Sequence, residues 1–138
     1  GSRVLRSSES DEVALIGAGV TVHEALKAAD TLAEDGIAVR VIDLYSIKPL
    51  DEETLRAAAE VTGGRLVTAE DHWSEGGLGD AVLAALADTE EPPRVVKLAV
   101  RDMPTSGKPD ELLARAGIDA AHIADAARRL VAQAVQTA

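Results

Sequence analysis

The sequence contains no cysteine and no phenylalanine, and it has only one tyrosine and one tryptophan among its 138 residues. Without cysteine the chain forms no disulfide, offers no thiolate nucleophile and cannot bind a metal through sulfur. Because 46% of the residues are nevertheless apolar, the core must be built from Val, Ile, Leu and Ala. Such side chains suit a parallel sheet that is closely covered by helices. At this length we expect one domain that buries about two thirds of its unfolded surface.

Basic residues are also scarce, since 14 Lys and Arg stand against 24 Asp and Glu and give a formal net charge of −10. Phosphate backbones and anionic lipids repel so acidic a chain, so we expect neither nucleic-acid binding nor membrane-surface binding. No apolar run approaches the roughly 18 residues of a membrane span, and we see no signal-peptide pattern. We therefore expect a cytoplasmic protein. The three His show no metal-ligand spacing such as His-Glu-x-x-His.

Apolar runs alternate with helical patterns along the chain. Near-continuous apolar or β-branched runs predict strands at 3–8, 13–17, 37–45, 65–70 and 94–100. Helices are predicted to begin near Thr21, after Asp51, near Leu78, at Asp110 and after Asp119. This alternation indicates an α/β fold with a mostly parallel sheet, right-handed crossovers and helices on both faces. We assign residues 1–12 to a tag remnant (Gly1-Ser2) and an edge strand, and residues 13–138 to a single domain.

Local signals mark the helix ends. Thr21 and Glu24 have the spacing of a capping box, and Gly36 is placed to end the first helix. Asp51 is predicted to cap a helix whose first turn is acidic, which suits the helix dipole. The faces predicted to be buried are Val22, Leu26, Ala29, Leu32 and Ala33 in the first helix, and Leu55, Ala58, Ala59 and Val61 in the second.

The stretch 65–80 contains the features most typical of a functional site. It is predicted as strand 65–70, a polar turn over 71–75 and the glycine-rich start of a helix near Leu78. If strand 13–17 lies centrally beside strand 65–70, residues 17–20 and 71–79 line the crevice at the carboxyl ends of the strands. The polar side chains expected there are Glu70, Asp71, His72, Glu75 and His23.

Two groups of residues in this crevice have alternative interpretations. Glu70, Asp71 and His72 could act as acid–base machinery, although such a cluster more often orders a loop through hydrogen bonds. The glycine-rich stretch 76–79 could cradle an anion. We favour its other role, in which the missing side chains let a helix pack closely against a strand.

The remaining candidates are weaker. Trp73 is more typical of a domain contact than of stacking on a substrate. Lys48, Arg101 and Lys108 could attract a phosphate, but they are sparse in an acidic chain. His122, in the first turn of the last helix, is expected to be an ordinary surface or capping residue.

Five stretches of the sequence together resemble the C-terminal domain of transketolase. They are Val13-Ala-Leu-Ile-Gly-Ala-Gly-Val-Thr-Val-His-Glu-Ala25, Ile47-Lys-Pro-Leu-Asp51, Glu70-Asp-His72, Glu75-Gly-Gly-Leu-Gly79, and Met103-Pro-Thr-Ser-Gly-Lys-Pro-Asp-Glu-Leu-Leu113 with Gly117-Ile-Asp119. The resemblance extends from Val13 to Val131. The β subunits of 2-oxo-acid dehydrogenases and deoxyxylulose-phosphate synthase share the fold and the glycine-rich helix start. The run from Ser106 to Leu113 is more similar to transketolase than to either.

The resemblance implies a three-layer α/β/α domain with a five-stranded mixed sheet, whose first edge strand is antiparallel to the others. It implies that this domain follows two thiamine-diphosphate-binding domains and contributes to dimer assembly. The family's enzyme, which serves the pentose phosphate pathway, moves a two-carbon ketol unit from a ketose phosphate to an aldose phosphate. It uses thiamine diphosphate and a divalent metal such as Mg²⁺, and its active-site residues lie mostly in the other two domains.

The composition agrees with this division of labour. Thiamine-diphosphate enzymes hold the metal and diphosphate with a Gly-Asp-Gly…Asn signature, but this chain contains no Asn and no Phe to stack on the aminopyrimidine. Because the cofactor supplies the carbanion chemistry, we expect no catalytic, cofactor-binding or metal-binding residue here, and an inactive isolated domain. The residues expected to form an interface or anion crevice are Glu70, Asp71, His72, Trp73, Gly76, Gly77, Gly79, Ser106 and Lys108.

The partners implied are the thiamine-binding domains of the same transketolase, in the same chain or in a separate subunit, and a second copy in a homodimer. Two other hypotheses stand beside this one. The chain could be an independent regulatory module that binds a phosphate or nucleotide in the strand-end crevice. It could also be a small free-standing enzyme that uses Glu70, Asp71 and His72, since fold alone does not give function.

Overall fold

The computed structural model describes residues 1–73, 77–100 and 107–137. In chain order the elements are β1 (Arg3–Arg6), β2 (Val13–Gly17), α1 (Val20–Glu34), β3 (Val39–Asp43), α2 (Glu52–Val61), β4 (Arg65–Trp73), α3 (Leu78–Ala85), β5 (Arg94–Val100), α4 (Pro109–Ala116) and α5 (Ala120–Thr137). The strands form one sheet in the order β1-β3-β2-β4-β5. β1 pairs with β3 in the antiparallel sense, whereas the other pairs are parallel. The predicted mixed sheet with an antiparallel first edge strand is therefore confirmed.

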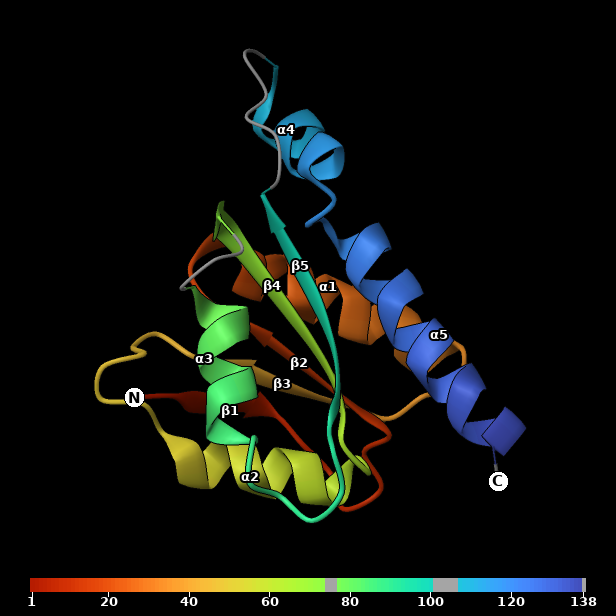
Figure 1. Ribbon diagram of the computed structural model, residues 1–138. Helices are drawn as coiled ribbons and strands as arrows, with labels where there is room; N and C mark the ends of the chain where they lie inside the picture. The colour runs from red at the N-terminus through yellow and green to blue at the C-terminus, as the bar shows by residue number, and fades with distance from the viewer. Residues whose placement is uncertain (74–76, 101–106, 138) are drawn as a thin grey trace.

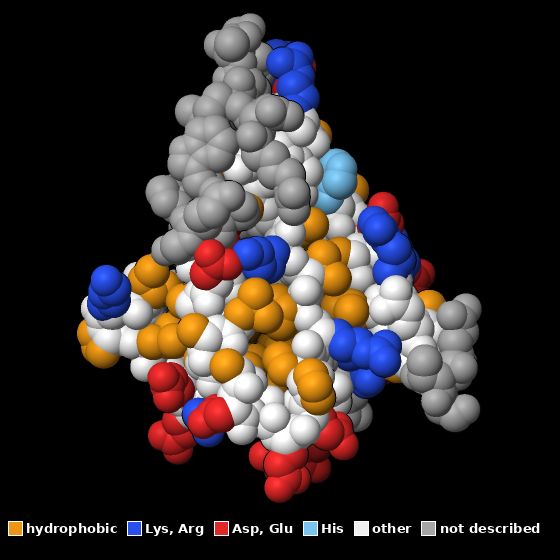
Figure 2. All heavy atoms as spheres, viewed as in Figure 1, with side chains coloured by type: hydrophobic (Ala, Val, Ile, Leu, Met, Phe, Trp, Pro, Cys, Tyr) orange, Lys and Arg blue, Asp and Glu red, His pale blue; other side chains and the backbone are white. Residues whose placement is uncertain are grey.

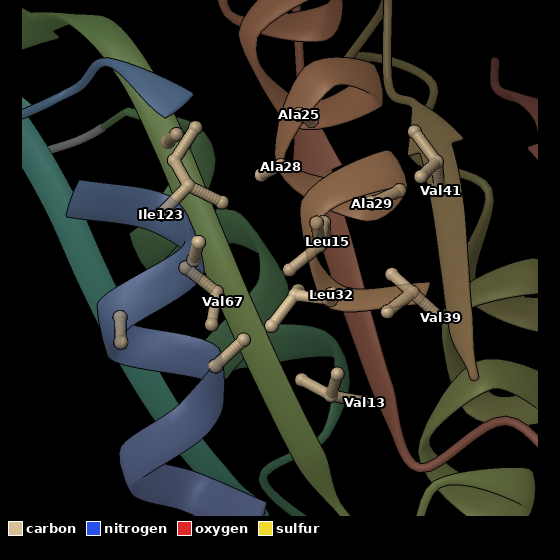
Figure 3. Packing of buried hydrophobic residues seen from close by; sticks show 14 of the residues in the cluster. Val13, Leu15, Ala25, Ala28, Ala29, Leu32, Val39, Val41, Val67 and Ile123 are labelled. Carbon is tan, nitrogen blue, oxygen red and sulfur yellow. The ribbon is translucent and has the colours of Figure 1, made fainter. Parts of the chain in front are cut away.

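Helices cover both faces of the sheet, which gives the three layers visible in Figure 1. On one face, Leu15 and Val67 from the strands meet Leu32 of α1 and Ile123 of α5 (Figure 3). On the other face, strand residues such as Ile16 pack against α2 and α3. Successive side chains of a strand point to opposite faces, so the neighbours Leu15 and Ile16 are buried in two different cores. This double burial explains why β2 reads as a continuous apolar run.

The order of the strands creates a switch point between β2 and β4. The chain first crosses from β2 to β3 through α1, on one face, and then returns through α2 on the other face to place β4 on the far side of β2. The connections therefore diverge at the carboxyl ends of β2 and β4. In open α/β sheets this divergence opens a crevice where ligands commonly bind.

β4 is longer than the sequence predicts. Residues 71–73 continue the strand instead of forming a turn, and the strand ends at Trp73 rather than Glu70. The reason is that β5 continues to Val100, which pairs with Trp73 after a register shift. β2 and β5 have the predicted bounds, whereas β1 ends at Arg6 and the third strand spans only Val39–Asp43.

The predicted capping box at Thr21 is wrong. Helix α1 begins at Val20 after Gly19, and the Thr21 hydroxyl bonds back to the carbonyl of Ala18 at 2.9 Å. The buried Glu24 carboxylate instead pairs with Lys27 at 2.9 Å and accepts from the Ala120 amide at 3.3 Å, and so joins α1 to α5. A spacing rule could not reveal that a distant helix end would compete for this carboxylate.

The other predicted helix ends are confirmed. Asp51 accepts from the Thr54 amide at 3.1 Å, Asp119 accepts from the His122 amide at 3.1 Å, and Gly36 follows α1 with a φ of 77°. Two residues assigned to buried faces are exposed, Ala33 in α1 and Val61 in α2. Both lie in the last turn of their helix.

Candidate functional site

Glu70 caps helix α3 from the end of the neighbouring strand. Its side chain is buried, with only 4% of the residue exposed. One carboxylate oxygen accepts from the amide of Leu78 and the other from the amide of Gly79, each at 2.8 Å. The residue at the N-cap position, Gly77, has no side chain to fill this role. Two of the helix's free amides are therefore satisfied by a charge that also suits the positive end of the helix dipole.

This contact decides how the glycine-rich helix start is used. An external anion would bind there through the same amides and the same dipole. Because Glu70 already accepts from Leu78 and Gly79, those two amides are not free for a phosphate. The exposed Asp71 adds a second negative charge beside them. The hypothesis of a phosphate- or nucleotide-binding regulatory module therefore finds no support in the geometry.

Gly79 lies where α3 approaches the sheet most closely. A Cβ built at Gly79 would be 2.9 Å from Cγ of Lys97 and 3.0 Å from Oγ1 of Thr68, closer than real Cβ contacts come. The Lys97 stem thus crosses the helix start, and its ammonium group pairs with Asp80. The Thr68 hydroxyl beneath is buried, and among the described residues it has no hydrogen-bond partner. A residue without a side chain is required here for packing.

The crevice predicted at the strand ends is present as a small hollow of ≈ 240 Å³. β2 lies centrally beside β4, as predicted. The residues that line the hollow are Ala18, Leu44, Tyr45, Ile47, Glu70, Asp71, Gly77 and Leu78. Its lining is mostly apolar, and its one buried carboxylate is already bonded to α3.

Three residues of this hollow, Leu44, Tyr45 and Ile47, were missed by the sequence reasoning, and two of them are exposed. Tyr45 is 63% exposed and Ile47 is 36% exposed, and both follow β3 in the loop 44–50. The sequence places Tyr45 at the end of the predicted strand 37–45. A signal for its role is that it is the only tyrosine of the chain and stands two residues before the Ile47-Lys-Pro-Leu-Asp51 motif.

The remaining residues that the sequence proposed for a site lie in several different parts of the chain. His72 and Trp73 lie in β4, which places their backbone beside β5, while Gly76, Ser106, Glu75 and Arg101 fall outside the described residues. Lys108 is exposed at the start of α4 and does not line the hollow. His23 is exposed and faces a separate hollow of ≈ 570 Å³ with Asp43. The structure therefore brings together Glu70, Asp71 and Gly77, with Gly79 just beyond them in α3.

Elsewhere in the described residues we find no better candidate for a ligand or metal site. A hollow of ≈ 470 Å³ lies at the opposite edge of the sheet, between α2 and residues 89–93, and Glu60, Glu90 and Glu91 line it. Figure 2 shows acidic side chains gathered along this lower edge. Within residues 1–73, 77–100 and 107–137, no group of three His, Asp or Glu side chains is arranged to hold a metal ion. No helix in these ranges is long and apolar enough to span a membrane.

Comparison with known proteins places this geometry in a family. Residues 2–123 match the family described as transketolase, C-terminal domain. The chain is 53% identical to mouse transketolase-like protein 2 over 131 residues, and 47% identical to human transketolase over 133 residues. These alignments cover 94% and 96% of the chain but only 21% of each relative. The chain thus spans about a fifth of the length of these relatives.

Solved structures of transketolases superpose on this chain. A split-gene transketolase, described as an inactive β4 tetramer, superposes with a TM-score of 0.85 at 37% identity, over 96% of this chain and 42% of that chain. A transketolase from Pichia stipitis shares the fold with a TM-score of 0.70 at 18% identity, over 96% of this chain and 18% of that chain. The chain therefore belongs to the family of transketolase C-terminal domains.

Proposed function

We propose that this chain serves as the C-terminal, structural domain of a transketolase. The intact enzyme would transfer a two-carbon ketol unit between sugar phosphates, with thiamine diphosphate and a divalent metal such as Mg²⁺ bound by other domains. The proposal rests on family membership and on the small share of each relative that the chain covers. It assigns to this chain a supporting role and no step of the reaction.

One observation carries the assignment of a supporting role. At the switch point of the sheet, where an α/β domain would bind a ligand, the amides of Leu78 and Gly79 hold the chain's own Glu70. A buried carboxylate whose two oxygens each accept from a backbone amide supports a structural role for Glu70.

The residues present do not fit the cofactor. The sequence contains no Asn for the Gly-Asp-Gly…Asn signature that holds the metal and diphosphate, and it contains no Phe. Glu70 and Asp71, the carboxylates at the hollow, would repel a diphosphate. We therefore assign the thiamine diphosphate and its metal to the preceding domains.

The partners of the chain would then be those thiamine-binding domains and a second copy of the enzyme. The β subunits of the split-gene transketolase form a tetramer, and the similar domain within that subunit supports a part in assembly. We place the intact enzyme in the cytoplasm, in agreement with the acidic composition.

Calorimetry on the purified 138-residue chain tests the supporting role. Titration with thiamine diphosphate and Mg²⁺ should give no binding heat, and the chain should not convert xylulose 5-phosphate and ribose 5-phosphate. The parent polypeptide with its upstream domains should do both. Tight cofactor binding or turnover by the chain alone would overturn the proposal.

A further inference from the structure

The loop 44–50 presents apolar side chains to solvent from a well-anchored backbone. Its first residue, Leu44, is buried and donates its amide to the carbonyl of Gly17 at 2.9 Å. A bridge between Ile47 and Leu50 closes the turn. At the far end Asp51 accepts from the amide of Thr54 at 3.1 Å and from its hydroxyl at 2.7 Å. Because the backbone of the loop is already held, binding a partner there would cost less loop ordering.

The exposed residues of this loop adjoin the hollow at the switch point. Tyr45 and Ile47 form one wall of the hollow, and Ala18 and Leu78 contribute apolar surface from the two neighbouring helix starts. Asp71 is exposed at its rim. In Figures 1 and 2 the loop forms the left margin of the molecule, where hydrophobic side chains are exposed around a basic one. We define the strand-end surface as the side chains of Ala18, Tyr45, Ile47, Leu78 and Asp71.

The direction of β1 shows which part of a longer chain would reach this surface. β1 is antiparallel to β3, and Arg3 pairs with Asp43, the last residue of β3. The amino end of β1 therefore lies at the same edge of the sheet as the loop 44–50, beside which Figure 1 places the N-terminus. Chain upstream of Arg3 must leave the domain from this edge. In relatives about five times longer than this chain, much polypeptide lies outside the matched region.

We infer that the strand-end surface is the docking site for the domain that precedes residue 3 in the intact polypeptide. This inference rests on the proposed function and specifies the partner of the strand-end region. The partner surface should place an apolar side chain in the hollow between Tyr45 and Leu78, with a basic group facing Asp71. The Glu70 cap holds Leu78 in position for this contact.

Hydrogen exchange tests the docking directly. Amides of residues 44–50 should exchange more slowly in the parent polypeptide than in the 138-residue chain, whereas those of residues 58–61, at the other end of α2, should exchange equally in both. Equal exchange of residues 44–50 in the two proteins would overturn the inference.

Paired substitutions separate docking from folding. The double variant Tyr45→Ala/Ile47→Ala should lower the thermal midpoint of this domain more in the parent than in the 138-residue chain, because only the parent loses the docking contact as well. The matched control, Val61→Ala/Leu83→Ala, alters two side chains that are each 38% exposed on helices and should lower the midpoint equally in both proteins. Equal shifts of the two proteins with Tyr45→Ala/Ile47→Ala would contradict the inference.

The transketolase assay of the parent distinguishes the two proposals. An active parent without protection of the loop would refute the docking surface and leave the proposed function standing. A parent that protects the loop but lacks transketolase activity would refute the proposed function alone. A natural polypeptide with no domain before residue 3 would refute the docking surface, and the absence of a thiamine-binding domain both upstream and in an adjacent gene would refute the proposed function.

Discussion

Glu70 and Gly79 are joined by a hydrogen bond of 2.8 Å from the backbone amide of the glycine to the carboxylate of the glutamate. The bond links β4 to the first turn of α3, across the stretch that the sequence marks as a possible anion site. The position that a ligand's charge would occupy is taken by a side chain of the protein. Three predictions about the chain's own residues follow from this arrangement and its surroundings.

Replacing Glu70 with glutamine should lower the free energy of unfolding by about 1–3 kcal/mol. The glutamine carbonyl can accept from one of the two amides, but its NH₂ group faces the other donor and leaves it unsatisfied. Urea unfolding measures the change. The control Glu60→Gln alters an exposed glutamate with no described partner and should change stability by a few tenths of a kcal/mol. Equal effects of the two substitutions would show that Glu70 is not a cap.

Replacing Gly79 with alanine should destabilise the chain, although alanine favours a helix by about 1 kcal/mol. The new Cβ would meet Cγ of Lys97 at 2.9 Å, and overpacking of this kind costs about 1–3 kcal/mol. A double-mutant cycle with Lys97→Ala should recover at least about 0.5 kcal/mol of that cost. Strictly additive effects in the cycle would mean that the close approach of α3 to β5 is not what requires the glycine.

The capping carboxylate of Asp51 should make stability depend on pH. Hydrogen bonds from Ser2 and then Thr54 hold the pKa of Asp51 below its usual value of 3.8. Because the folded-state pKa is the lower one, the carboxylate stabilises the fold fully above pH 3.8, and this contribution is lost as the pH falls through the folded-state value. The stability difference between the wild type and Asp51→Asn should therefore be largest near neutral pH and shrink below pH 3.8.

Urea titrations at a series of pH values, down to the lowest at which the domain stays folded, measure this difference. Glu9→Gln is the matched control, because Glu9 is exposed and has no described partner. Its difference from the wild type should stay near zero at every pH. A difference for Asp51→Asn that does not change with pH would contradict the assignment of this cap.

The sequence contained enough to predict the architecture. The continuous apolar run of β2, the alternation of strands and helices, and caps such as Asp51 and Asp119 all reflect local chemistry or burial on both faces. The predictions that were wrong concern residues whose contacts lie far away in the chain. Glu24 does not form the predicted capping box, and its carboxylate instead accepts from the Ala120 amide at the start of α5. β4 extended beyond Glu70 because β5, about 30 residues later, continues beside it.

The site was predicted in position but only partly in content. The strand order predicted from the sequence placed the crevice at the ends of β2 and β4. The lack of a side chain on glycine favoured close packing of a helix against a strand, and Gly79 lies at such a contact. No pattern could show that Glu70 would fold back onto Leu78 and Gly79, since that bond depends on how α3 approaches the sheet. The predicted strand 37–45 likewise includes Tyr45, but β3 ends at Asp43 and Tyr45 lies exposed in the loop that follows.

Removal of this domain from its parent tests the central claim most directly. A parent polypeptide that lacks the residues equivalent to 3–138 should assemble poorly in analytical ultracentrifugation and should lose most of its transketolase activity, because its catalytic domains would lose their structural support. A truncated parent that dimerises and turns over sugar phosphates as well as the intact enzyme would contradict the claim.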